Sequence, residues 1–174
     1  MAGDEPGLIR TAGPGDAEAI AEIYAHHVLH GTASFDTVPP DTDAWSAKIA
    51  DIAARGWPFL VVEEDGAILG YAYATQFRDR PAYAETCENS IYVAPDHSGR
   101  GVGSALMAAL LPAAANAGFR QMIAVVGGAE PASVALHKKF GFEIAGRMRN
   151  VGRKFGRLLD TVYLQRALDD EEIA

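Results

Sequence analysis

A glutamate on an apolar strand and two arginines in the loop before it are the residues best suited to chemistry. Glu88 opens the strand-like run 88–93, where partial burial would raise the carboxyl pKa and make it a useful general base. Arg78 and Arg80 stand one residue apart, and paired guanidinium groups bind a carboxylate or another oxyanion well. A solvent-facing glutamate and surface arginines paired with nearby acids remain the alternative. The pattern favours a base beside an anion-binding group.

His137 is a second candidate, because a histidine can give a proton to a leaving group near neutral pH. A packing role for it is equally open. Asn89 and Ser90 follow Glu88 and offer hydrogen-bonding groups to a substrate. A predicted helix also carries a cluster of three histidines, His26, His27 and His30. We expect no metal there, since no further Cys or His lies nearby to complete a site.

Residues 97–104 read H-S-G-R-G-V-G-S, a glycine-rich turn between an apolar strand and a helix dense in Ala and Leu. Such glycines allow a tight turn and leave space for a ligand, and N–H groups at a helix N-terminus favour a phosphate. A P-loop needs a lysine after the glycines, and a Rossmann fingerprint needs G-x-G-x-x-G near the first strand. The remaining match is a resemblance to the Q/R-x-x-G-x-G/A pyrophosphate loop of GNAT acyltransferases, with Ser98 at the usual Gln or Arg position. A glycine turn without a ligand is the other interpretation.

Periodicity and turn residues predict the elements that position these groups. We expect, in order, a strand at 8–11, a helix capped by Asp16, a helix around 45–52, strands at 59–62, 68–75 and 88–93, a helix at 105–117, a strand at 121–126, a helix at 131–140 and strands at 142–147 and 161–166. Asp65-Gly66 signals a hairpin turn. Pro112 lies inside a predicted helix, where we expect a kink.

Composition limits the classes of partner. The chain has 174 residues, 49% of them hydrophobic and 22% charged, as expected for one globular domain. A formal charge of −8 argues against nucleic acid or an anionic membrane as the main partner. Cys87 is the one cysteine, so no internal disulfide forms and a reducing compartment is favoured. With no signal peptide in 1–7 and no long apolar run, we expect a cytoplasmic location.

A longer set of residues joins these motifs: Thr32-Ala33-Ser34-Phe35, Arg78-Asp79-Arg80, Tyr83, Glu88, Ser90, Tyr92-Val93, the glycine loop, Leu136-His137, Gly141-Phe142, Lys154-Phe155-Gly156 and Asp160. From about Ile9 to Leu168 the chain resembles the phosphinothricin and methionine sulfoximine N-acetyltransferases of the GNAT superfamily. The resemblance implies an α/β fold, a single-domain GNAT fold with a mixed, mostly antiparallel sheet flanked by helices. The domain would span 8–168, after a flexible segment 1–7 and before an acidic tail 169–174.

The resemblance also implies transfer of acetyl from acetyl-CoA, without a metal, to the α-amino group of a small amino-acid analogue. Glu88 would be the base, directly or through water, and His137 would protonate the leaving thiolate. The substrate site would comprise Phe35, Arg78, Asp79, Arg80, Tyr83, Glu88, Asn89 and Ser90. Acetyl-CoA would be held by Ile91, Tyr92 and Val93 along its pantetheine arm, by Gly99, Arg100, Gly101, Val102, Gly103 and Ser104 at its pyrophosphate, and near Glu130, where the family commonly has asparagine.

Family members are often homodimers in which the partner subunit helps to shape the pocket, so a homodimer is expected. Two other functions stay open. One is a GNAT enzyme for another amine, such as a protein N-terminus, although the arginine pair argues against cationic acceptors. The other is a non-catalytic acyl-CoA-binding module, which the presence of both Glu88 and His137 disfavours.

Overall fold

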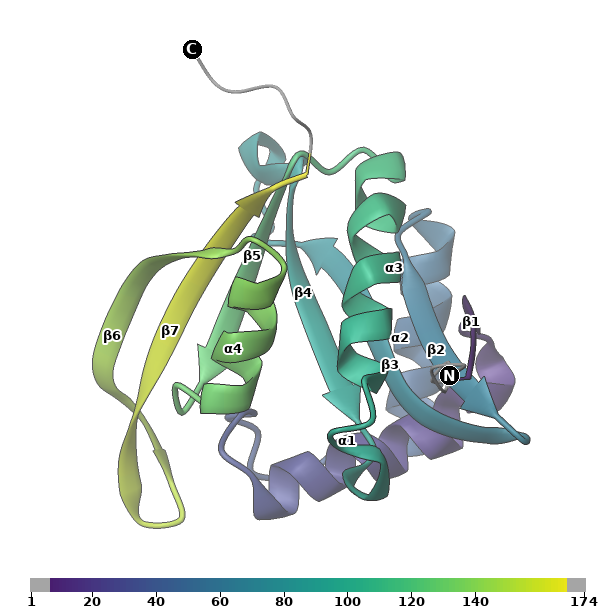
Figure 1. Ribbon diagram of the computed structural model, residues 1–174, viewed down its shortest axis with the longest axis horizontal. Helices are drawn as coiled ribbons and strands as arrows, with labels where there is room; N and C mark the ends of the chain where they lie inside the picture. Colours follow the sequence, from purple (N-terminus) through teal and green to yellow (C-terminus); the bar gives the residue numbers. More distant parts are fainter. Residues whose placement is uncertain (1–6, 169–174) are drawn as a thin grey trace, which may run out of the picture.

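A single seven-stranded sheet, in the order β1-β2-β3-β4-β5-β7-β6, organises the molecule (Figure 1). The structure is a computed structural model that describes residues 7–168. The expected acidic tail 169–174, and the expected flexible segment 1–7 apart from Gly7, lie outside the described residues. The strands are β1 (Leu8–Thr11), β2 (Phe59–Glu64), β3 (Ala67–Gln76), β4 (Thr86–Val93), β5 (Gln121–Gly127), β6 (Glu143–Lys154) and β7 (Arg157–Ala167). The helices are α1 (Ala17–His30), α2 (Thr42–Ala54), α3 (Val102–Asn116) and α4 (Pro131–Lys139), with short 3-10 turns at Pro14–Asp16, Pro81–Tyr83 and Pro95–His97.

Helices cover both faces of this sheet and divide the core in two. Apolar residues of α1 and α2 pack with one face of β2 and β3, whereas α3 and part of α4 pack on the opposite face. Strand neighbours are antiparallel except β4 and β5, which run parallel. The expected α/β, mostly antiparallel fold is thereby confirmed. Within residues 7–168, no helix is both long and apolar enough to cross a membrane.

Local signals explain several boundaries. The β2–β3 turn places Asp65 and Gly66 at φ values of 51° and 82°, the positive angles that a two-residue hairpin turn with Asp-Gly requires. Asp41 caps α2 by accepting a hydrogen bond from the Ala44 N–H at 2.9 Å, and the chain leaves the helix at Gly56, whose φ is 70°. These elements therefore lie where the sequence predicts them.

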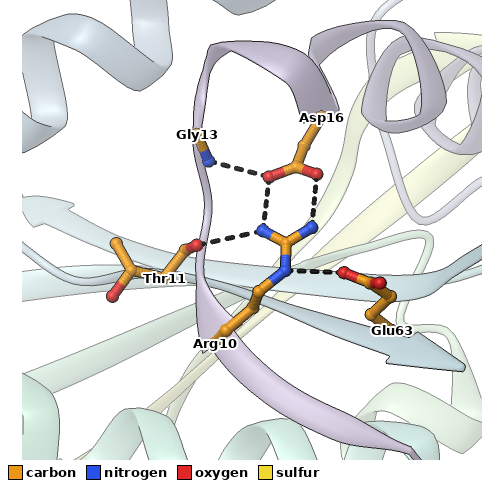
Figure 2. A network of polar contacts seen from close by, with 5 residues as sticks. All are labelled: Arg10, Thr11, Gly13, Asp16 and Glu63. Atoms are coloured by element: carbon orange, nitrogen blue, oxygen red, sulfur yellow. Dashed lines mark hydrogen bonds and ion pairs between the residues drawn. The ribbon is translucent and has the colours of Figure 1, made fainter. Parts of the chain in front are cut away.

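The role predicted for Asp16 is wrong in one respect. Asp16 stands at the N-terminus of α1, but its carboxylate makes no capping bond to that helix. Instead it accepts two hydrogen bonds from the guanidinium of Arg10 at 2.8 Å and one from the Gly13 N–H (Figure 2). Arg10 also binds Glu63 through Nε, so this network ties β1 to β2 and to the start of α1. The arginine lowers the pKa of the Asp16 carboxyl.

The last two strands are longer than predicted. They extend beyond the expected ranges 142–147 and 161–166 to form a hairpin that turns at Phe155 and Gly156, both with positive φ. Polar and glycine-rich residues, together with register shifts between Ile144 and Gly146 and between Met148 and Gly152, hide the alternation that marks a strand. The α3 helix begins at Val102, three residues earlier than predicted, and continues through Pro112.

Candidate active site

Strands β4 and β5 part in the middle of the sheet, and the candidate site lies in the opening. Their register pairs Thr86–Glu88 with Gln121–Ile123, and within the described chain the pairing stops there (Figure 1). A cavity of about 100 Å³ occupies the gap. Its lining comprises Ala33, Glu88, Asn89, Ser90, Ile91, Tyr92, Ala124, Val125, Val126, Ser133 and His137. The sheet thus brings five predicted site residues of β4 together with His137.

Alternation along β4 sends its side chains to two different surroundings. Glu88 and Ser90 share register positions with Thr75 and Tyr73 of β3, on the face that α1 and α2 cover. We call this the acceptor face. Cys87 packs in the core formed with α3, and Asn89 reaches Met107 of α3 and His137 of α4. We call this second surface the cofactor face.

Two positive charges act on the Glu88 carboxylate on the acceptor face. Arg78 approaches it at 3.6 Å, in a pair that is partly open to solvent. Burial raises the pKa of Glu88, and the positive charges of Arg78 and Lys48 partly oppose that rise. The Lys48 ammonium also donates to the Tyr73 hydroxyl at 2.7 Å. The raised pKa and the nearby positive charges are compatible with Glu88 as a general base, which stays a prediction.

Lys48 is a site residue that the sequence analysis missed. It stands three residues after Trp45 on α2, a spacing that puts both side chains on one side of the helix. Its ammonium lies over the Trp45 ring at 5.1 Å. That spacing is the available signal, but it does not reveal that Lys48 reaches Tyr73 of β3 or that its charge opposes the rise in the pKa of Glu88.

The other predicted substrate residues lie around this centre rather than in it. Asp79, Arg80 and Tyr83 are exposed in the segment between β3 and β4. Gln76 holds that segment by donating to the backbone oxygens of Arg78 and Arg80. The structure therefore brings Arg78 to Glu88, while Arg80 stays on the exposed loop.

Phe35 lies on the far side of the opening, in a slot that two glycines leave free. A Cβ atom on Gly127 or Gly152 would collide with its ring. The buried Lys154 ammonium donates to the Ser34 oxygen at 2.8 Å, and Ser34 Oγ also pairs with the Tyr24 hydroxyl. These contacts fasten the segment before α2 to the tip of the β6–β7 hairpin.

The cofactor face offers an open strand edge. The Ala94 N–H donates to Leu69 of β3, so by alternation the backbone groups of Ile91 and Val93 point to the opposite edge. Those of Tyr92 point to β3, and its side chain packs against Tyr24 instead. His27 from α1 approaches the Val93 oxygen at 2.8 Å, a contact that the sequence analysis did not foresee.

The glycine loop continues from this edge into α3. Gly99 and Gly101 have φ values of 78° and 83°, and the space where a side chain would stand is empty at both. Val102 is buried in the core, so it anchors the loop. The loop therefore leaves its N–H groups open at the start of a helix of 15 residues.

Side chains near the loop have partners of their own. Arg100 reaches Glu64 at 3.2 Å and His97 at 2.7 Å. Glu130 caps α4, accepting the Ser133 N–H at 2.7 Å, which explains how an acid is accommodated there. Lys139 donates to Ser104 Oγ at 3.1 Å and brings a positive charge to the start of α3 that the sequence analysis missed.

His137 and Asn89 form a buried polar pair between α4 and β4. Both side chains are less than a tenth exposed. His137 Nε2 lies 2.9 Å from Asn89 Nδ2, and His137 Nδ1 lies 2.7 Å from the Ser133 oxygen. Burial lowers the pKa of His137, which favours its neutral form.

A larger groove of about 870 Å³ lies elsewhere, between the end of α4 and the outer strands. Its charged lining residues are Lys139, Glu143 and Arg166. Because Glu88 and His137 both line the smaller cavity, that cavity is the better candidate for catalysis.

Comparisons with known proteins give the same picture over nearly the whole chain. Residues 9–163 match the model of the acetyltransferase (GNAT) domain family. The phosphinothricin N-acetyltransferase of Alcaligenes faecalis is 48% identical over 92% of this chain and 82% of its own. The L-methionine sulfoximine/L-methionine sulfone acetyltransferase of Salmonella typhimurium is 39% identical over 93% of this chain and 95% of its own.

A solved structure agrees with these sequence matches. The crystal structure of a GNAT superfamily phosphinothricin acetyltransferase from Sinorhizobium meliloti, in complex with AcCoA, superposes with a TM-score of 0.91. It is 43% identical and covers 94% of this chain and 89% of its own.

Proposed function

The chain belongs to the GNAT acetyltransferase family and is an acetyl-CoA-dependent acyltransferase; we propose that it acetylates the α-amino group of a small amino-acid analogue. Phosphinothricin, methionine sulfoximine and methionine sulfone are the acceptor types that its relatives' names suggest. We assign the catalytic domain to residues 8–168. Cys87 is a free, buried thiol, and we place the enzyme in the reducing cytoplasm.

The ion pair of Glu88 with Arg78, together with the nearby charge of Lys48, carries the proposal. An α-amino acid presents a basic amine next to a carboxylate, and these groups match a carboxylate base beside Arg78 and Lys48. Glu88 takes a proton from the ammonium, directly or through water. The freed amine attacks the thioester carbonyl, so a C–N bond forms, the C–S bond breaks and coenzyme A leaves as the thiolate. The second proton that the amine nitrogen loses as the amide forms passes to water, and the thiolate takes a proton from water.

The residues around the β4–β5 opening fit acetyl-CoA. The backbone groups of Ile91 and the Val93 N–H, which no strand pairs, suit the amide groups of the pantetheine arm, which would lie there as an added strand does; the Val93 oxygen already contacts His27. The empty cradle at Gly99 and Gly101 suits the pyrophosphate, with Lys139 close enough to offset its charge. When bound, acetyl-CoA supplies the activated acetyl group.

A thiol-release assay over a panel of acceptors tests the proposal. Phosphinothricin, methionine sulfoximine, methionine sulfone, ordinary amino acids, a polyamine and a short peptide would each be incubated with the enzyme and acetyl-CoA. We expect the highest kcat/KM for the amino-acid analogues. Release of thiol with the polyamine or the peptide alone would overturn the acceptor class, and no release with any amine would favour a binding module.

We also propose that the enzyme works as a homodimer through the β6–β7 hairpin. Strand β6 is one of the two edge strands of the sheet, and the hairpin stands out from the body of the molecule (Figure 1). Its large apolar side chains are about half exposed: Ile144, Met148, Val151, Phe155 and Leu158. An apolar edge strand is the kind of surface that a second copy covers. The partner would then lie close to Phe35 and the acceptor face.

Light scattering would measure the oligomeric state of the wild type and of Val151→Glu. We expect the wild type to have the mass of a dimer and the variant that of a monomer, with a higher KM for the acceptor. Glu143→Gln, an exposed change on the same strand, is the control. A monomeric wild type would contradict the proposed homodimer, and the conclusion that the protein is an acyltransferase would still stand.

A further inference from the structure

The hydrogen bonds of His137 determine which of its nitrogens carries the proton. The Ser133 backbone oxygen can only accept, so Nδ1 at 2.7 Å must be the protonated nitrogen. The neutral ring then has a lone pair at Nε2, which accepts an N–H from the Asn89 amide at 2.9 Å. Nε2, the nitrogen nearer β4, therefore has no proton to give to a leaving thiolate.

The same bonds orient Asn89. Its Nδ2 carries two hydrogens: one goes to His137, and the other points toward the Met107 sulfur at 4.0 Å. The opposite amide orientation would set the Asn89 oxygen against the His137 lone pair, with two acceptors facing each other. His137 would escape that clash only as a cation, which its burial disfavours. The Asn89 oxygen also lies 3.4 Å from Nε2, but that nitrogen carries no proton in this tautomer, so the contact is not a hydrogen bond. Among residues 7–168 the oxygen therefore has no hydrogen-bond donor.

The Asn89 oxygen is a buried hydrogen-bond acceptor that a ligand with an N–H group could satisfy. Asn89 lines the cavity between β4 and β5 and is less than a tenth exposed, so its oxygen is largely shielded from bulk water. Buried polar atoms without partners are costly. The acyl-CoA arm that enters this opening carries secondary amides, whose N–H groups are suitable donors.

We propose that His137 is a positioning residue: as the neutral Nδ1–H form, it holds the Asn89 amide so that its oxygen accepts a hydrogen bond from an amide N–H of the acyl-CoA arm. Asn89 is then a cofactor-binding residue rather than an acceptor-binding one, and His137 acts through it. Catalysis loses no necessary step, because a thiolate is a stable leaving group that can take its proton from water. The inference rests on acetyl-CoA binding and is independent of the acceptor.

Calorimetric titration with acetyl-CoA, without any acceptor, is the first test. Asn89→Ala and His137→Ala should each raise the Kd by about tenfold, the order of one buried hydrogen bond. The double variant should be no weaker than either single one, because both changes remove the same contact. Additive losses, or an unchanged Kd in Asn89→Ala, would overturn the proposal. A wild type that fails to bind acetyl-CoA would overturn the family-level activity instead.

His137→Gln separates positioning from acid catalysis. A glutamine can place its amide oxygen near the position of Nε2 and accept from Asn89, but it does not titrate. We expect it to keep the Kd, the kcat and the basic limb of the kcat profile within about threefold of wild type, as a retained hydrogen bond would. A kcat loss of about a hundredfold at unchanged Kd would mark His137 as an acid. His30→Gln, an exposed histidine on α1, is the matched control, and thermal unfolding would establish that each variant folds.

Discussion

The two faces of β4 do different work with different kinds of polar group. The acceptor face places a carboxylate beside Arg78 and under the charge of Lys48, partly open to solvent. The cofactor face places neutral groups in a buried hydrogen-bonded chain from Ser133 through His137 to Asn89. Adjacent residues of one strand, Glu88 and Asn89, thus have opposite environments.

This difference follows from what each face must handle. A general base must exchange a proton close to a charged acceptor. Partial solvation and nearby cations lower the free-energy cost of its negative charge. An uncharged thioester arm needs fixed donors and acceptors, and a neutral buried network provides them without the desolvation cost of an ion. This division predicts that a substitution that removes a charge lowers activity far more on the acceptor face than on the cofactor face.

Glu88→Gln should have the largest effect. The amide keeps the size of the side chain but cannot accept the proton, so kcat/KM should fall by about 10²- to 10⁴-fold. The Kd for acetyl-CoA should stay the same, because the side chain faces α2 rather than the cofactor face. Thiol-release kinetics and calorimetry measure the two quantities, with the exposed Glu18→Gln as control. Unchanged turnover would exclude Glu88 as the base.

Local sequence signals predicted the secondary-structure elements that carry the site. The hairpin at Asp65-Gly66, the helix ended by Gly56 and the strand carrying Glu88 depend on neighbours in sequence, and all are present. Contacts between distant segments were not accessible: Lys48 with Tyr73, and Asn89 with His137. Each arises from how helices cross the sheet, which no short pattern encodes.

Lys154→Met should have the next largest effect. Removing the ammonium leaves the Ser34 oxygen without its donor, at a cost of about 1–3 kcal/mol in the free energy of unfolding. Phe35 and its segment would loosen, so the KM of the acceptor should rise several-fold while that of acetyl-CoA stays constant. Chemical denaturation and kinetics would be compared with Arg153→Met, an exposed neighbour. Equal rises in the KM of the acceptor and the KM of acetyl-CoA would mean that the β6–β7 hairpin supports the cofactor face as well as the acceptor face.

Lys48→Met should shift a pH profile rather than abolish activity. Lys48 favours the charged form of Glu88, so its loss should raise the pKa of that carboxyl further above its usual value. The enzyme needs the deprotonated base, so the acidic limb of kcat/KM should move to higher pH. The plateau at alkaline pH should fall by several-fold, because the acceptor carboxylate loses one of its two cations. Lys138→Met on α4 is the control. An acidic limb at the same pH as in the wild type would contradict the assignment of Lys48 to the acceptor face.

Alkylation of Cys87 should give the smallest effect, and it tests whether the core behind the cofactor face is closed to water. Burial raises the pKa of its thiol to about 12, so almost no thiolate exists near neutral pH. Treatment of the native enzyme with iodoacetamide should leave the mass and the activity unchanged, whereas the guanidinium-unfolded chain should gain one carbamidomethyl group. Rapid alkylation of the native protein would show that the core beside Asn89 opens to water. The neutral chain of Ser133, His137 and Asn89 would then lose the dry surroundings on which its fixed orientation depends.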